Sequence, residues 1–153
     1  MKTLQKKSTI HIGAAGELLV QYKLLKYGVN SAAMTTDFGI DLVAYSPKNN
    51  RPFTLQVKTQ QEPTKGGGKG KLSIGWDLRD NSPAELICLV DLSCDSAWLF
   101  TFSEFKTLAQ QHSAKGVLKL YMYVDETINT KKDMALKSQF ENYKLENRIV
   151  TFF

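Results

Sequence analysis

The chain has 153 residues, of which 42% are hydrophobic and 23% are charged, and its net charge is +5 at pH 7. This length and composition are typical of a folded domain and exclude a disordered or fibrous chain. No run approaches the roughly 18 apolar residues of a membrane span, and the first residues lack the apolar segment of a secretory signal. We therefore expect a soluble, cytoplasmic protein without a membrane partner, and its positive charge makes nucleic acid a natural partner.

The first predicted element is a helix over residues 13–27. Apolar side chains recur there at spacings of three and four, and Gly28 follows as a stop signal. Residues 40–45 are apolar and β-branched, residues 46–52 are rich in turn formers, and residues 53–58 alternate with period two. The sequence therefore predicts a helix followed by a β-hairpin.

A glycine- and lysine-rich segment follows the hairpin. Residues 59–71 include the run Lys-Gly-Gly-Gly-Lys-Gly-Lys, which starts at Lys65 and has no apolar side chain to pack. Because glycine adds conformational freedom and the lysines repel one another, we expect a mobile, positively charged loop.

The remaining sequence predicts further strands and helices. They fall at residues 86–92 (strand), 97–102 (strand), 103–109 (helix capped by Ser103), 117–124 (strand) and 131–145 (helix). This order of elements predicts an α/β fold, or α+β in looser usage, with a mixed central sheet flanked by helices in a single domain.

The hairpin brings polar residues together inside a core-like strand. A turn centred near Asn49 places Asp41 opposite Val57 and diagonal to Gln56 and Lys58, within about 7–8 Å. Gln56 and Lys58 are two positions apart, so they share one face of their strand while its apolar residues point to the other. A lysine in such a strand is costly to bury without an acidic partner, and such pairs cluster at functional sites.

Phosphodiester hydrolysis needs this combination of groups. Carboxylate and carbonyl oxygens bind a hard cation such as Mg²⁺, for which Mn²⁺ can substitute. The cation polarises the scissile phosphate and lowers the pKa of a bound water. A lysine beside it orients that water or stabilises charge on the phosphate. The hairpin therefore favours metal-dependent hydrolysis.

Three short motifs lie in order within residues 9–59: Gly16-Glu17 in the first helix, Asp-Phe-Gly-Ile-Asp at 37–41 and Gln-Val-Lys at 56–58. Together they resemble the PD-(D/E)XK nucleases, in particular the small Holliday-junction-resolvase-like and intron-homing-type members. The resemblance implies a restriction-endonuclease-like core and metal-dependent cleavage of double-stranded or branched DNA. It also implies an active site made of the metal ligands Glu17, Asp41 and Gln56 and the catalytic Lys58.

On this interpretation, residues 1–153 form a single nuclease-like domain, with the basic loop at 59–71 and further strands and helices at 72–153. Two residues depart from the family pattern. Ile40 replaces the proline before the motif aspartate, and Gln56 replaces an acid. A glutamine brings a carbonyl oxygen but no charge, so we expect weaker metal binding and one ion rather than two.

The candidate DNA-binding residues lie beyond the second strand of the hairpin. Lys65, Lys69 and Lys71 can reach DNA phosphates and give affinity without sequence preference, although a solvated linker would have the same composition. Trp76, next to this loop, is a further candidate for DNA contact. The loop lacks the glycine spacing and the Lys-Ser/Thr ending of a P-loop, so no nucleotide cofactor is expected.

Cleavage of both strands of DNA is most simply done by a homodimer or larger assembly, because one active site cuts one strand. His11, His112, Cys88 and Cys94 lack the spacing of a zinc site and are expected to be structural or surface residues. Two alternatives remain open, both on the same fold: a catalytically inactive DNA-binding module, and a module that binds another protein.

Overall fold

The computed structural model describes residues 4–36 and 38–153. Its helices are α1 (Thr9–Lys26), α2 (Phe102–Leu108) and α3 (Leu145–Phe152), with 3₁₀ turns η1 (Gly66–Gly68) and η2 (Lys137–Tyr143). Its strands are β1 (Asn30–Ala33), β2 (Leu42–Tyr45), β3 (Pro52–Gln60), β4 (Thr64–Lys65), β5 (Leu72–Arg79), β6 (Leu86–Asp91), β7 (Ser96–Thr101), β8 (Gln111–His112) and β9 (Val117–Tyr123). None of these described helices is long and apolar enough to span a membrane.

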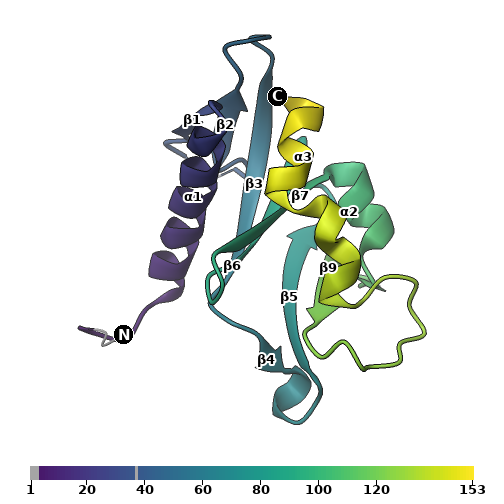
Figure 1. The fold of residues 1–153 in the computed structure, drawn as a ribbon. Helices are drawn as coiled ribbons and strands as arrows, with labels where there is room; N and C mark the ends of the chain where they lie inside the picture. The colour runs from purple at the N-terminus through teal and green to yellow at the C-terminus, as the bar shows by residue number, and fades with distance from the viewer. Residues whose placement is uncertain (1–3, 37) are drawn as a thin grey trace.

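The strands form two sheets (Figure 1). The first is mixed, with the order β1-β2-β3-β6-β7, in which β3 and β6 run parallel and the other neighbours run antiparallel. The second is antiparallel, with the order β4-β5-β9-β8. The mixed sheet flanked by helices confirms the predicted fold class, whereas the second sheet was not predicted.

Helix α1 begins earlier than the predicted residue 13. Ser8 caps it, because the Ser8 hydroxyl accepts the His11 backbone N–H while the His11 ring accepts the Ser8 N–H. The helix ends just before Gly28, whose positive φ of 76° confirms the predicted stop. His11 is therefore a capping residue, as expected.

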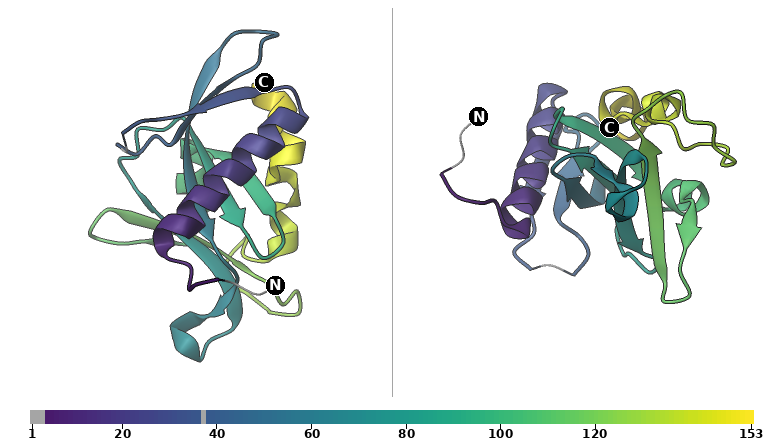
Figure 2. Two further views of the ribbon diagram at one scale, coloured as in Figure 1. Left: turned by 90° about the vertical axis from the view of Figure 1, so that its left-hand side faces the viewer. Right: turned by 90° about the horizontal axis from the view of Figure 1, so that it is seen from below.

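Two apolar cores hold the layers together. Helices α1 and α3 cover one face of the mixed sheet (Figure 2), where Val20 and Ile149 pack on the sheet residues around Leu55. The antiparallel sheet, α2 and η2 cover the other face. Every residue of β6 is buried, because this strand is covered on both faces. Cys88 lies on β6, where burial raises the pKa of its thiol, and Cys94 is an exposed thiol.

The hairpin has the predicted strands but a different register. Leu42 pairs with Leu55, whereas the predicted pairing of Asp41 with Val57 would have placed Leu42 opposite Gln56. The predicted pairing was therefore wrong by one residue. The pairing ends at Leu42, so the position of Asp41 beside β3 is set by its own hydrogen bonds rather than by the register.

Three other predictions were wrong. Residues 59–71 are not a structureless loop, because β3 extends to Gln60 and the segment then forms β4 and η1. Helix α2 is capped by Thr101 rather than by Ser103. The predicted helix at 131–145 is replaced by η2 and α3, because the extended backbone at Lys144 (φ −53°, ψ 140°) separates them and pairs with Trp98.

Candidate active site

The site is built where β2 and β3 separate. The Asp41 N–H donates to the Leu55 carbonyl at 2.8 Å, and the Val57 N–H donates to Asp41 Oδ2 at 2.7 Å. The pairing of β2 with β3 ends at Leu42, so this carboxylate takes the place of a strand partner for the Val57 N–H. These two bonds fix the carboxylate of Asp41 against the backbone of β3.

Gln56 and Lys58 lie on one face of β3. Both are half-buried, whereas Leu55 and Val57 between and beside them are buried in the core under α1. Strand alternation therefore directs the two polar side chains away from α1, as the sequence predicted. Asp41 lies at the edge of this stretch, bonded to the main chain of Leu55 and Val57.

A serine that sequence reasoning missed holds Gln56 in place. The Ser82 hydroxyl donates to Gln56 Oε1 at 2.7 Å. Ser82 Oγ also accepts the Ala84 backbone N–H at 3.4 Å, which holds the serine side chain in the loop before β6. The Gln56 carbonyl oxygen that accepts from Ser82 keeps a second lone pair for another partner. Ser82 lies in the loop before β6, 26 residues after Gln56, and only the pairing of β3 with β6 brings the two together.

Glu17 lies on α1 next to the residue at which this helix meets β3. Its neighbour Gly16 is buried, and a Cβ added there would lie 1.8 Å from Thr59 Oγ1. The backbone of α1 therefore lies directly against β3 at Thr59, one residue after Lys58. Glu17 is half-buried. The structure thus places Asp41, Gln56 and Lys58 along one stretch of β3, with Glu17 on the helix that packs against this strand.

The loop before Asp41 packs on the loop that carries Ser82. Gly39 has a positive φ of 85°, and a Cβ added there would lie 2.9 Å from Pro83 Cδ. Both observations explain a glycine at this position of the motif. The first residue of the motif, Asp37, lies outside the described residues.

The candidate residues offer oxygen ligands. Asp41 and Glu17 supply carboxylates and Gln56 supplies an amide carbonyl, a set that suits a hard cation such as Mg²⁺. Within residues 4–36 and 38–153, no group of three or more His, Cys, Asp and Glu side chains comes together as a metal site. The candidate ligands are two acids, Glu17 and Asp41, and one neutral amide, Gln56.

Trp76 is not a DNA contact, and this prediction was wrong. Its side chain is 1% exposed, its Nε1–H donates to the Val90 carbonyl at 3.1 Å, and its ring packs on Trp98 at 5.8 Å. The residue lies on β5, where Ile74, Trp76 and Leu78 point into the second core. The alternation of apolar residues at every second position is the sequence pattern of a strand with one buried face.

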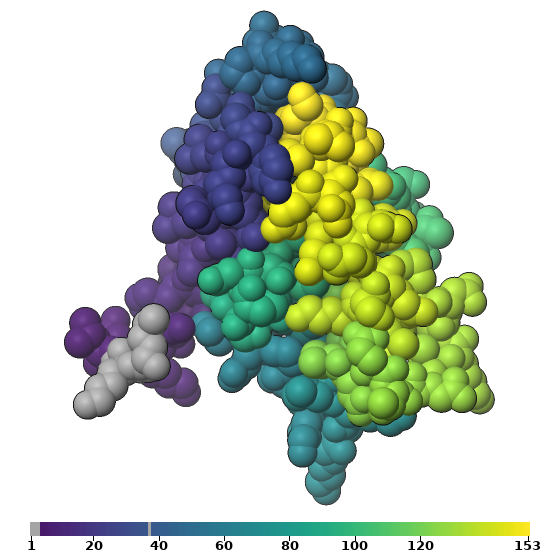
Figure 3. Space-filling view, viewed as in Figure 1, coloured from purple at the N-terminus to yellow at the C-terminus, as the bar shows by residue number. Residues whose placement is uncertain are grey.

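The three predicted lysines are exposed on the hairpin of β4 and β5, which forms the lower tip of the molecule in Figure 3. A polar pocket of about 430 Å³ lies between this hairpin, the end of β3 and β9. Lys65 and Lys71 line it and Lys69 does not. Its lining also includes Lys119 and Tyr121 of β9, which sequence reasoning missed because the pairing of β5 with β9 joins distant parts of the chain.

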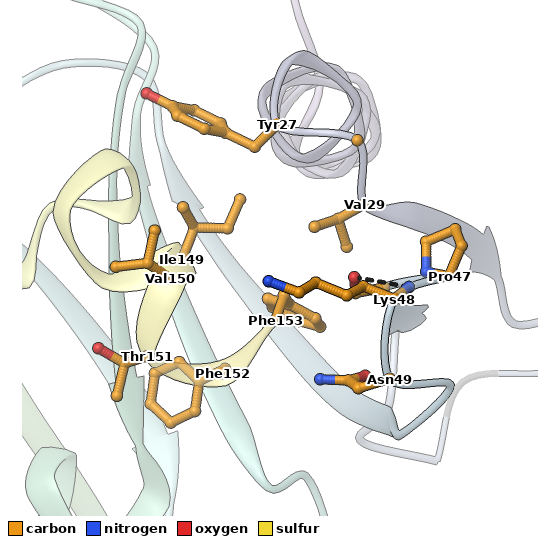
Figure 4. Close-up of a pocket in the computed structure, with 12 residues that line it drawn as sticks. Tyr27, Val29, Pro47, Lys48, Asn49, Ile149, Val150, Thr151, Phe152 and Phe153 are labelled. Carbon is orange, nitrogen blue, oxygen red and sulfur yellow. Dashed lines mark hydrogen bonds between the residues drawn. The ribbon is translucent and has the colours of Figure 1, made fainter.

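A larger pocket, of about 750 Å³, lies elsewhere, between the end of α1, the β2–β3 turn and α3. Figure 4 shows Lys48 extending across it toward Phe153. Among its described lining residues no side chain carries a carboxylate, and most are apolar. Size alone therefore does not identify the catalytic centre in this protein, since hydrolysis of a phosphodiester requires groups that bind metal or move protons.

No protein-family profile matches the chain, and no curated protein matches its sequence. Among solved structures, the fold is similar to that of a bacterial homing endonuclease, I-Ssp6803I, with a TM-score of 0.62. The match covers 95% of this chain and 92% of that chain, at 15% sequence identity. The similarity is therefore one of fold, and this chain has a mixed α+β, nuclease-like fold with two sheets flanked by helices.

Proposed function

We propose that this protein is a Mg²⁺-dependent DNA endonuclease of the PD-(D/E)XK type that hydrolyses phosphodiester bonds in double-stranded or branched DNA. The observation that carries the proposal is the polar pair Gln56 and Lys58 on one face of β3, with Asp41 fixed at the edge of this strand by the Val57 N–H. The nuclease-like fold supports it, because a homing endonuclease shares that arrangement of elements.

In the proposed site, Asp41, Gln56 and Glu17 hold the metal ion through their oxygens. When bound, the ion supplies Lewis-acid chemistry and a water of lowered pKa. Lys58 shares a face of β3 with Gln56, where its amine can orient the attacking water or stabilise charge on the phosphate. Ser82 keeps the carbonyl of Gln56 directed by its hydrogen bond.

The DNA partner is supported by the position of the basic hairpin. Lys65 and Lys71 are exposed, and the hairpin follows the strand that carries Lys58. Contacts to phosphates hold DNA without reading its sequence, so they suit a nuclease whose specificity lies in other features.

We further propose that the active form is a homodimer or larger assembly, since cutting two strands requires two sites. Helix α1 supports this, because Ile10, Leu18 and Leu25 are 81%, 66% and 60% exposed and lie on one face of the helix. Sedimentation velocity at several protein concentrations tests it, and a monomer at all concentrations would contradict it.

A cleavage assay tests the proposed activity. Wild-type protein and the Asp41→Ala and Lys58→Ala variants are incubated with supercoiled plasmid and with a four-way DNA junction, in Mg²⁺, in Mn²⁺ and in EDTA. We expect cleavage by the wild type in either metal, none in EDTA and none by the folded variants. Preference for plasmid or junction identifies the substrate class.

The same assay separates the endonuclease from a catalytically inactive module on this fold. Gln56 is the residue that favours the inactive module, because it replaces an acid. Folded wild-type protein that binds DNA but leaves both substrates intact in Mn²⁺ would contradict the endonuclease. Folded protein that binds neither the plasmid nor the junction would favour a module that binds another protein.

A further inference from the structure

The polar pocket of about 430 Å³ begins where the candidate active site ends. Gln60 lines it and follows Lys58 by two residues on the same face of β3, a distance of about 7 Å along a strand. Gln60 Nε2 donates to the Gly75 carbonyl at 2.7 Å, which ties the end of β3 to β5 of the second sheet. The pocket therefore lies next to Lys58 along the direction of β3.

The lining of the pocket carries excess positive charge. Three lysines line it, Lys65 and Lys71 from the hairpin and Lys119 from β9, against one acid, Glu62. Lys119 Nζ lies 3.9 Å from Asp77, at the limit of an ion pair, and its side chain is 43% exposed. Exposed pairs of this length contribute little, so the lysine keeps its capacity to bind an anion.

The residues that line the pocket suit a sugar-phosphate backbone. A Cβ at Gly75 would lie 3.1 Å from Lys119 Cε and 3.3 Å from Tyr121 Cβ, so the absence of a side chain keeps the floor open. The half-buried Tyr121 and Tyr123 form the wall, with ring centroids 5.4 Å apart. Burial and the neighbouring Tyr123 raise the pKa of Tyr121. A tyrosine hydroxyl is a group that can donate a hydrogen bond to a phosphate.

We propose that this pocket binds the sugar-phosphate backbone of one DNA strand next to the phosphate that is cleaved, with Lys65, Lys71 and Lys119 as phosphate ligands. The inference rests on the proposed endonuclease function for the identity of the strand as DNA. It assigns binding to a particular surface, and it separates Lys71 from Lys69, which lies in the same hairpin and outside the pocket lining.

The test is a binding titration with fluorescently labelled duplex and single-stranded DNA of equal length, in EDTA, over a series of salt concentrations. The full chain is compared with its Lys71→Ala, Lys119→Ala, Lys69→Ala and Lys26→Ala variants, all of which remove one positive charge. Lys26 lies in the last turn of α1, at the other end of the molecule from the hairpin (Figure 1).

We expect Lys71→Ala and Lys119→Ala to weaken binding several-fold and to reduce the slope of log affinity against log salt by about one. Lys69→Ala and Lys26→Ala should weaken binding less and leave the slope closer to that of the wild type. Similar losses in all four variants would mean that only the overall charge matters, and no loss in Lys71→Ala and Lys119→Ala would also overturn the proposal.

Cleavage kinetics distinguish this inference from the proposed function. The pocket variants should raise KM and keep kcat, because their lysines hold DNA away from the reacting phosphate. Normal binding by the pocket variants together with metal-dependent cleavage would reject the pocket and keep the endonuclease. Weakened binding by those variants, in a protein that cuts nothing, would keep the pocket and reject the endonuclease.

Discussion

The two faces of β3 do different work. On the face toward α1, Leu55 and Val57 are buried and Thr59 meets the helix backbone at Gly16. On the other face, Gln56, Lys58 and Gln60 form a polar row from the candidate active site to the polar pocket. The first face gains free energy from apolar burial, whereas the second places polar groups in a half-buried strand at a cost. Because side chains alternate along β3, one face of the strand stabilises the fold and the other carries the groups proposed for chemistry.

The largest effect is expected at the centre of the polar face. Lys58→Ala should lower the rate of DNA cleavage at least about a hundredfold, because the amine no longer stabilises charge on the phosphate or orients water. The thermal midpoint should stay close to that of the wild type, since removing a lysine from this strand leaves the core intact. Cleavage assays beside calorimetry check both, and a variant that cuts normally would place the chemistry elsewhere.

On the buried face of β3, a substitution should lower stability and leave activity unchanged. Leu55→Ala should lower the free energy of unfolding by about 2–5 kcal/mol, because Leu55 is 0% exposed and its removal leaves a cavity. Cleavage per folded molecule should change little. Urea unfolding followed by circular dichroism measures the loss. A stable variant that has lost its activity would show that the two faces are not independent.

The contact between α1 and β3 gives a further test of the stabilising face. Gly16→Ala should destabilise the fold by about 1–3 kcal/mol, since the new methyl group would lie 1.8 Å from Thr59 Oγ1. Thr59→Gly removes all three Thr59 atoms closest to that methyl group, so the double variant should recover stability relative to the sum of the two single changes. Additive losses in a double-mutant cycle would show that the contact is not direct.

Local pattern was sufficient to predict the hairpin and the polar face of β3. The register was not predictable from it, because the turn is set by the Ser46 carbonyl, which accepts from Asn49 and Asn50, and by the positive φ of 54° at Asn50. This geometry shifts the pairing of β2 with β3 by one residue.

The second sheet and the pocket depend on pairing between distant segments. Nothing near Lys119 or Tyr121 in the sequence indicates that β9 lies beside β5, 42 to 46 residues earlier at those positions by the observed register. Composition gave the charge of the hairpin but not which lysines face the pocket. Trp76 was predicted to contact DNA because it lies near the basic segment in the sequence. In the structure it lies on the buried face of β5.

The smallest of the expected effects concerns Ser82, which supports the polar face without belonging to β3. Ser82→Ala should weaken the apparent affinity for Mg²⁺ about tenfold, because Gln56 then loses the donor that directs its carbonyl. Ser82→Thr keeps a hydroxyl and should restore much of that affinity, which a purely structural role for the loop would not explain. The metal concentration for half-maximal cleavage measures the change, and kcat at saturating metal should remain near that of the wild type. An unchanged metal dependence in Ser82→Ala would mean that Gln56 is oriented by β3 itself, and that the polar face needs no help from the loop before β6.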